Sequence, residues 1–183
     1  RGVFESPIVS EALVAGAYDV TLPLWFRIVR QLPLPRKLGV LERLIGWELG
    51  RHGLAWVVVS TGYWWLLDLS ESTQRWCVYG DYEGPLQMRW LRGWLASGGV
   101  VVDSGANFGQ TVQYFAVMPG VRTLAFEPTR LARRSLEESL RRNALRSVEV
   151  IGLGLSDVAG AFEIRVDGAR STLQTSWYRD RCL

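Results

Sequence analysis

The second half of the sequence predicts an α/β fold built on a parallel, doubly wound sheet. Three observations lead to this prediction: short apolar segments alternate with helical patterns, a glycine-containing turn follows the first apolar segment, and acidic residues follow the strands. Strand, helix, strand, helix, strand is the order from which a parallel sheet is built. The 183 residues, 48% of them hydrophobic, are enough for one domain with a real core.

The first half predicts a helix and a hairpin. Residues 1–36 contain four prolines, which interrupt any long helix. Residues 57–59 and 64–67 are apolar and flank a Ser-Thr-Gly turn, a pattern typical of a β-hairpin. Eight of the nine tryptophans lie before residue 95, and we expect them in a packed core or interface. An amphipathic helix is predicted at residues 37–51 from the helical spacing of Leu38, Leu41, Ile45 and Leu49.

The second half carries the alternating elements. Residues 99–102 are continuously apolar, as in a strand buried on both faces, whereas residues 161–166 alternate like an exposed strand. Thr129 is a candidate N-cap for the second helix. Strands are predicted at residues 99–102, 121–126, 148–155 and 161–166, and helices at residues 110–118 and 129–143.

The turn after residues 99–102 carries the candidate site. It reads Asp103-Ser104-Gly105-Ala106-Asn107-Phe108-Gly109, a D-x-G-x-x-x-G pattern. Gly105 supplies permissive dihedral angles and lacks a Cβ where a ligand approaches the backbone, and Gly109 lets the start of the helix pack closely. A carboxylate ahead of the first glycine is a poor neighbour for a pyrophosphate at the helix N-terminus. It suits a cation such as a sulfonium or an α-ammonium group.

Two further acids follow the next two strands. Glu127 ends the strand 121–126 and can accept both hydroxyls of an adenosine ribose. Asp157 ends the third strand, within reach of an adenine amino group. Because ligands of open α/β sheets bind at the carboxyl ends of the strands, Asp103, Glu127 and Asp157 are expected to line one nucleoside-binding crevice.

These residues resemble the FkbM family of S-adenosylmethionine-dependent methyltransferases. The likeness covers roughly residues 64–175, in VVVDSGANFGQT, TLAFEP, RRNALRSVEVIGLGLSD and the upstream LLDLSESTQRWCVYGDYEGPLQMRWL. It implies a Rossmann-like domain, S-adenosylmethionine as cofactor, and O-methylation of a sugar, glycan or secondary-metabolite hydroxyl. It also implies that Asp103, Gly105, Asn107 and Gly109 shape the methionine side of the site, that Glu127 holds the ribose and that Asp157 holds the adenine.

The sequence departs from this family after the third strand. FkbM methyltransferases continue with a fourth strand and three more, and residues 167–183 carry no such pattern. We therefore expect a domain truncated after its third strand. Residues 1–95 would form a helical and hairpin extension, and residues 96–183 the first half of the cofactor-binding domain. The strand that ends at Asp103 would then be a sheet edge with one face uncovered.

The sequence identifies no catalytic base and no metal site. An acceptor hydroxyl usually needs a base such as His, Asp or Lys. His52 is interpreted as a helix-end residue, whereas Asp81 and Glu83 flank Tyr82 in a loop that could roof the cofactor. One histidine and two distant cysteines exclude a multi-histidine metal site and a zinc cluster.

The charge and hydropathy patterns suggest few macromolecular partners. A net charge of +3 is too small to predict nucleic-acid binding. The most apolar stretch, residues 54–69, is shorter than the ~20 residues a membrane-spanning helix needs. With no signal-peptide pattern in the first residues, a cytoplasmic location is expected. The basic residues around the predicted helix form a solvated face or else contact an anionic membrane surface or partner: Arg27, Arg30, Arg36, Lys37, Arg43 and Arg51.

Two alternatives to a methyltransferase stay open. A nicotinamide-dependent dehydrogenase also uses an acid after its second strand, but the D-x-G-x-x-x-G spacing disfavours it. A catalytically inactive remnant would act as a binding module through its Trp-rich, basic N-terminal part. Affinity for a nucleoside distinguishes the methyltransferase and the dehydrogenase from the binding module.

Overall fold

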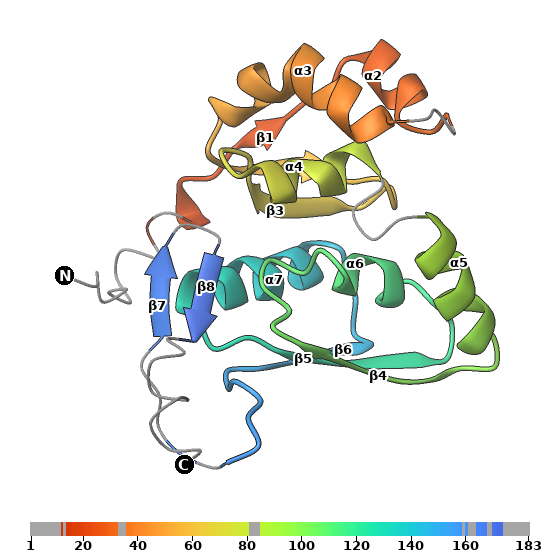
Figure 1. The fold of residues 1–183 in the computed structure, drawn as a ribbon, viewed down its shortest axis with the longest axis vertical. Helices are drawn as coiled ribbons and strands as arrows, with labels where there is room; N and C mark the ends of the chain where they lie inside the picture. Colours follow the sequence, from red (N-terminus) through yellow and green to blue (C-terminus); the bar gives the residue numbers. More distant parts are fainter. Residues whose placement is uncertain are drawn as a thin grey trace.

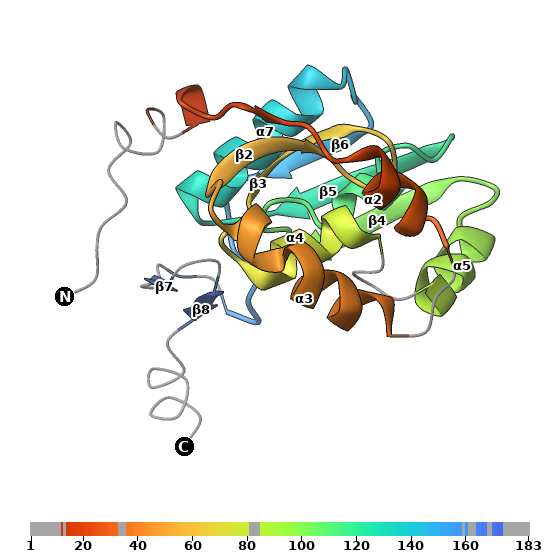
Figure 2. The same cartoon turned by 90° about the horizontal axis from the view of Figure 1, so that it is seen from above.

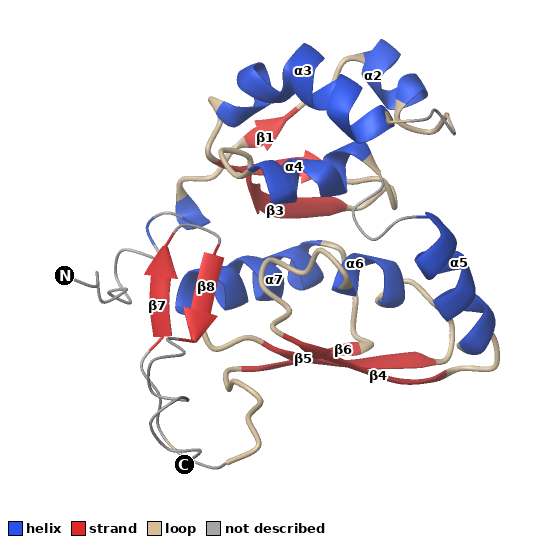
Figure 3. Cartoon of the chain, in the orientation of Figure 1, coloured by secondary structure: helices blue, strands red, loops and turns tan. Residues whose placement is uncertain are grey.

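The computed structural model describes residues 12, 14–32, 36–80, 85–158, 160, 164–167 and 170–173, and it is a mixed α/β structure. In chain order the elements are β1 (Asp19–Val20), α2 (Leu24–Val29), α3 (Lys37–Gly50), β2 (Leu54–Val58), β3 (Trp64–Asp68), α4 (Ser72–Tyr79), α5 (Pro85–Trp94), β4 (Gly99–Ser104), α6 (Val112–Phe115), β5 (Val121–Phe126), α7 (Arg130–Arg142), β6 (Val148–Ile151), β7 (Ile164–Asp167) and β8 (Arg170–Leu173). Helices α6 and α7 lie between the β1–β3 sheet and the β4–β6 sheet, while α2 and α3 lie outermost (Figures 1 and 3).

The N-terminal sheet has the order β1-β2-β3 and confirms the predicted hairpin. Strands β2 and β3 pair antiparallel, with Val57 opposite Trp65, and β1 pairs parallel to β2. Helix α3 also forms as predicted, because its apolar residues at helical spacing reach the core. Leu41, Ile45 and Leu49 are buried there.

The second sheet is parallel with the order β4-β5-β6, as the alternating pattern predicts. Helices α6 and α7 cover one face, and among the described residues no helix covers the other (Figure 1). Strand β4 is an edge strand, and Val100 and Val102 are more than half exposed. The edge and the uncovered face are those expected for the strand that ends at Asp103. The described residues thus form a three-stranded parallel sheet with helices on one face, and the doubly wound, Rossmann-like methyltransferase type remains a prediction.

Three predicted elements differ from the structure. Helix α6 is shorter than residues 110–118, since its last residues turn toward Pro119, which disfavours a helical residue before it. Strand β6 ends at Ile151 rather than at residue 155, and the exposed residues that follow include Gly152 and Gly154. Residues 161–163 of the last predicted strand lie outside the described residues. The rest forms β7, which pairs antiparallel with β8, an unpredicted strand, in a separate hairpin.

One buried cluster joins residues from both predicted domains, from Val20 to Leu140. The backbone groups at the free edge of β3 form hydrogen bonds with side chains of α7 and of the residue that follows it. Asn143 accepts the Trp64 N–H at 3.1 Å and donates to the Trp64 carbonyl at 2.5 Å, and Ser139 accepts the Leu66 N–H at 2.9 Å. A side chain that covers edge backbone groups keeps another strand from pairing there. The boundary at residue 95 remains a prediction.

The tryptophans divide between core and surface. Trp65 is fully buried, and its Nε1 donates to the Phe108 carbonyl at 2.6 Å, which fixes the hairpin against the turn after β4. The Arg142 guanidinium lies over the rings of Trp56 and Trp64, 4.6 and 4.4 Å from their centroids. Four others are exposed, namely Trp25, Trp47, Trp90 and Trp94.

Candidate functional site

The parallel register brings the predicted turn beside the end of β5. Ser104 pairs with Phe126, and Phe126 pairs with Ile151, so the three strands end at one edge of the sheet. The N–H groups of Gly105 and Ala106 both donate to the Phe126 carbonyl at 2.9 Å. The turn is therefore anchored next to the residue that follows Phe126, which is Glu127.

The Glu127 carboxylate ties the turn to the start of α7. Its Oε2 accepts the Asn107 N–H at 2.7 Å, and its Oε1 accepts the Thr129 N–H at 2.7 Å and the Thr129 hydroxyl at 2.6 Å. The residue is only 2% exposed. Backbone N–H groups that would otherwise be unpaired at a loop and a helix start are thus satisfied by one charge.

Thr129 does not cap α7 through its side chain, contrary to the prediction. It occupies the N-cap position with an extended backbone, but its hydroxyl makes no bond to the helix. The hydroxyl donates instead to the Glu127 carboxylate, because a charged acceptor two residues away is stronger than a neutral backbone partner.

The two glycines of the turn have different surroundings. Gly105 has φ +80°, and a Cβ built on it would meet no atom of the described residues within 4 Å, so the backbone faces a space that this part of the chain leaves open. A Cβ on Gly109 would lie 2.5 Å from a Leu136 methyl carbon and 3.0 Å from the Trp65 ring. Gly109 therefore allows the close packing that the sequence suggested, and Gly105 leaves room for a ligand. Between them, Asn107 has φ +50°, and its Oδ1 accepts the Phe108 N–H at 2.9 Å.

Of the other two predicted acids, Asp103 lies next to the turn and Asp157 lies in a loop after β6. Asp103 is half-buried in the last part of β4, directly before the turn. Asp157 is exposed, six residues after Ile151, and accepts a bond from Ser156 Oγ at 3.2 Å. The structure thus brings Asp103, the turn and Glu127 together, and it leaves Asp157 in an exposed loop on the same strand-end side of β6.

The candidate bases add little to this site. His52 follows the C-terminus of α3, as interpreted from the sequence, and its Nδ1 lies 2.7 Å from the Tyr18 hydroxyl. Asp81 and Glu83 lie outside the described residues. Within the described part of the chain, no group of three potential metal-ligating side chains is arranged around one point.

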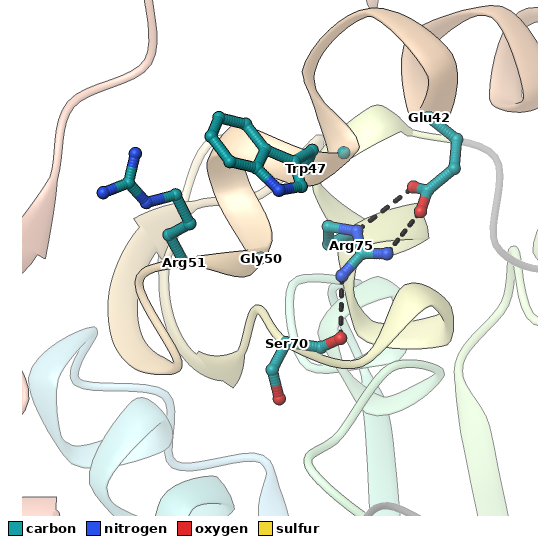
Figure 4. Close-up of a pocket in the computed structure, with 7 residues that line it drawn as sticks. Glu42, Trp47, Gly50, Arg51, Ser70 and Arg75 are labelled. Atoms are coloured by element: carbon teal, nitrogen blue, oxygen red, sulfur yellow. Dashed lines mark hydrogen bonds and ion pairs between the residues drawn. The ribbon is translucent and has the colours of Figure 1, made fainter.

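A cleft of about 420 Å³ lies elsewhere, against α3 and α4 (Figure 4). Arg75 forms an ion pair with Glu42 in this cleft and donates to the carbonyls of Leu69 and Ser70 at 2.7 and 2.9 Å. None of the predicted site residues lines the cleft, whose lining is Glu42, Gly46, Trp47, Gly50, Arg51, Ser70 and Arg75.

The charges in the cleft are internally balanced. The Arg75 hydrogen bond lowers the pKa of Glu42 below its ordinary value, and Tyr79 donates to the same carboxylate at 2.7 Å. Burial and that carboxylate raise the pKa of Tyr79 well above its usual range. This arrangement fastens α3 to α4. Arg75 and Tyr79 lie 33 and 37 residues from Glu42, so no local pattern in the sequence could have indicated it.

Comparisons with known proteins give two partial matches. No protein-family model matches it. Over 59 residues it is 51% identical to the AMB antimetabolite synthetase AmbE of Pseudomonas aeruginosa, a match spanning 32% of this chain and 3% of that protein. A solved structure from Pyrococcus horikoshii, described as "putative transferase PH0793", overlaps 71% of this chain and 63% of its own, with 16% identity and a TM-score of 0.36. The FkbM resemblance remains a prediction.

Proposed function

We propose that the chain binds S-adenosylmethionine at the carboxyl edge of the β4–β6 sheet and belongs to an O-methyltransferase. The observation that carries the proposal is the open space in front of Gly105, in a turn that follows an acidic strand end. The carboxyl edge of a parallel sheet is where open α/β folds bind ligands. A glycine with no neighbour at its Cβ position fits a bulky group lying against the backbone.

Charge favours a sulfonium nucleoside over a dinucleotide at this turn. Asp103 lies directly before the turn and would attract a sulfonium or α-ammonium group, whereas it would repel a pyrophosphate. An ionised carboxylate offers about four acceptor positions, and protein donors already take three on Glu127. We therefore assign Glu127 to holding the turn and to accepting one ribose hydroxyl rather than two. Asp157 is assigned to the adenine amino group.

The cofactor would supply an electrophilic methyl group for in-line displacement by an acceptor oxygen. The residues of this chain contribute position: the turn holds the nucleoside at the sheet edge, and Glu127 keeps the turn in place. A general base for the acceptor hydroxyl is not assigned. The identity to an antimetabolite synthetase over 59 residues supports a small-molecule acceptor of the secondary-metabolite class, with a glycan as the alternative.

Calorimetric titration with S-adenosylhomocysteine tests the proposal with a matched pair of variants. Gly105→Ala and Gly62→Ala each put a Cβ on a glycine with positive φ, +80° and +88°, where no atom of the described chain lies within 4 Å. Both should lose a similar stability, about 1–2 kcal/mol, because an L-residue is strained there. Only Gly105→Ala should also weaken the binding of S-adenosylhomocysteine, by tenfold or more.

The alternatives give different results in the same experiment. Binding of NAD in place of S-adenosylhomocysteine would indicate a dehydrogenase. A folded chain that binds neither compound would contradict cofactor binding and favour a binding module. Equal affinity of wild type and Gly105→Ala would show that a nucleoside, if bound, lies away from this turn.

A further inference from the structure

Helices α2 and α3 expose an unusual number of large hydrophobic side chains. Of the fifteen such side chains exposed in the described part of the chain, seven lie between residues 24 and 47, each 43–77% exposed. They are Leu24, Trp25, Ile28, Leu32, Val40, Leu44 and Trp47. Exposed apolar side chains that gather in this number mark an interaction site more often than scattered single ones do.

These residues follow the helical repeat. In α3, Val40, Leu44 and Trp47 recur at intervals of four and three, so they share one face, which lies next to the buried stripe of Leu41 and Ile45 around the helix. Helix α3 is thus apolar on its core side and on its solvent side. In α2 and the residues after it, the exposed stripe lies opposite Phe26, which is fully buried and anchors that helix.

Two of the six basic residues in this region are internal. Arg30 Nη1 donates to the carbonyls of Val58 and Val78 at 2.6 and 3.4 Å. Lys37 Nζ donates to the carbonyls of Arg30 and Leu32 at 2.8 and 3.3 Å. Both side chains are buried, which corrects the prediction of a wholly solvated basic face. Lys37 thereby joins the start of α3 to the end of α2, whereas Arg30 joins the end of α2 to the carbonyls of β2 and α4.

The other four cations are exposed beside the apolar stripes. Arg27, Arg36, Arg43 and Arg51 are exposed, and Glu48 is the exposed acid among the described residues from 24 to 51. Arg51 lies over the Trp47 ring, 5.0 Å from its centroid. We call this set of seven apolar and four arginine side chains the α2–α3 surface. Both helices lie on the side of the β1–β3 sheet away from α6 and α7 (Figure 1), and they face the viewer in Figure 2.

We propose that the α2–α3 surface docks on an anionic lipid bilayer. Apolar side chains, two of them tryptophan, would enter the boundary between headgroups and acyl chains, where the amphipathic indole ring is favoured. Arginine stems cover apolar surface while their guanidinium groups reach lipid phosphates. The contact is peripheral, since none of the described helices is long and apolar enough to cross a bilayer. It does not depend on the proposed function.

The charge balance distinguishes this occupant from other candidates. Four exposed arginines against one exposed glutamate complement a negatively charged surface. A second copy of the same surface would instead bring like charges together, which is unfavourable. The exposed face of β4 has no such charge pattern at Val100 and Val102, so nothing there indicates what covers it.

Vesicle sedimentation of the full chain tests the proposal. We expect it to pellet with vesicles of phosphatidylcholine mixed with phosphatidylglycerol, to be released by high salt, and to stay in solution with phosphatidylcholine alone. Trp47→Ser should weaken the partitioning about tenfold or more, and Arg43→Gln about fivefold. Trp94→Ser is the matched control, because Trp94 is 75% exposed on α5 and Trp47 is 77% exposed on α3.

Quenching by brominated lipid gives a second readout. It should occur in the wild type and fall in Trp47→Ser but not in Trp94→Ser. Unchanged thermal melting will show that the variants fold. If Trp47→Ser does not fold, Arg43→Gln still tests the proposal. Failure to bind anionic vesicles, equal binding to neutral ones, or an equal effect of Trp94→Ser would overturn the proposal. Self-association that Trp47→Ser abolishes, without vesicle binding, would show a second copy as the occupant.

Discussion

Replacing Glu127 by glutamine should destabilise the protein strongly, because this carboxylate accepts three internal hydrogen bonds at 2.6–2.7 Å. A hydrogen bond to a charged group contributes about 1.5–3 kcal/mol. Glutamine keeps one acceptor oxygen, which can retain the two bonds from Thr129, and its NH₂ group then faces the Asn107 N–H. We expect a loss of about 2–4 kcal/mol, from one charge-assisted bond and one unpaired buried donor.

Urea denaturation followed by circular dichroism measures this loss, with Glu149→Gln as the control. The control makes the same chemical change on β6, where the ion pair of Glu149 with Arg122 is exposed and contributes about 0–1 kcal/mol to stability. Amide hydrogen exchange at Asn107 should quicken in Glu127→Gln only. If Glu127→Gln lost no more stability than Glu149→Gln, the carboxylate would not hold the turn, and the reasoning about the site would be wrong.

The remaining predictions concern the packing around the site and the cleft. Gly109→Ala should cost about 2–4 kcal/mol in denaturant titrations, because its Cβ would come within 2.5 Å of a leucine methyl group and φ is +86°. Asn143→Ala should cost about 2–3 kcal/mol and expose the Trp64 amide to hydrogen exchange, since two backbone groups at the β3 edge lose their partner; an unchanged midpoint would show that the edge needs no cover. Glu42 has its pKa lowered below 4.5 by Arg75, so its stabilisation is present above about pH 4.5 and is lost as the pH falls through the lower folded pKa. Glu42→Gln should therefore be less stable than wild type at neutral pH, and the difference should shrink in acid melts.

Local periodicity accounts for the elements that could be predicted. The hairpin at residues 54–68, α3 and the three parallel strands each follow from residues that are near neighbours in the sequence. Their spacing determines which side chains share a face, and that requires no knowledge of the partner. The position of the candidate turn was equally predictable, because a glycine turn after an apolar strand is a local signal. The ends of α6 and β6 differ from the prediction, although Pro119, Gly152 and Gly154 stand in the sequence near them, because such residues mark a boundary only to within a few positions.

The sequence by itself determined the order of the hairpin, α3 and the alternating elements from β4 to β6, the turn from Asp103 to Gly109 and the acids that follow the strands. Only the tertiary structure decided what those residues contact. Glu127 is buried under protein donors, and Gly109 lies against Trp65, which is distant in the chain. Arg30 and Lys37 are internal, although their neighbours among the arginines are exposed. A side chain's charge is a property of one residue, but its burial depends on segments that meet only when the chain folds.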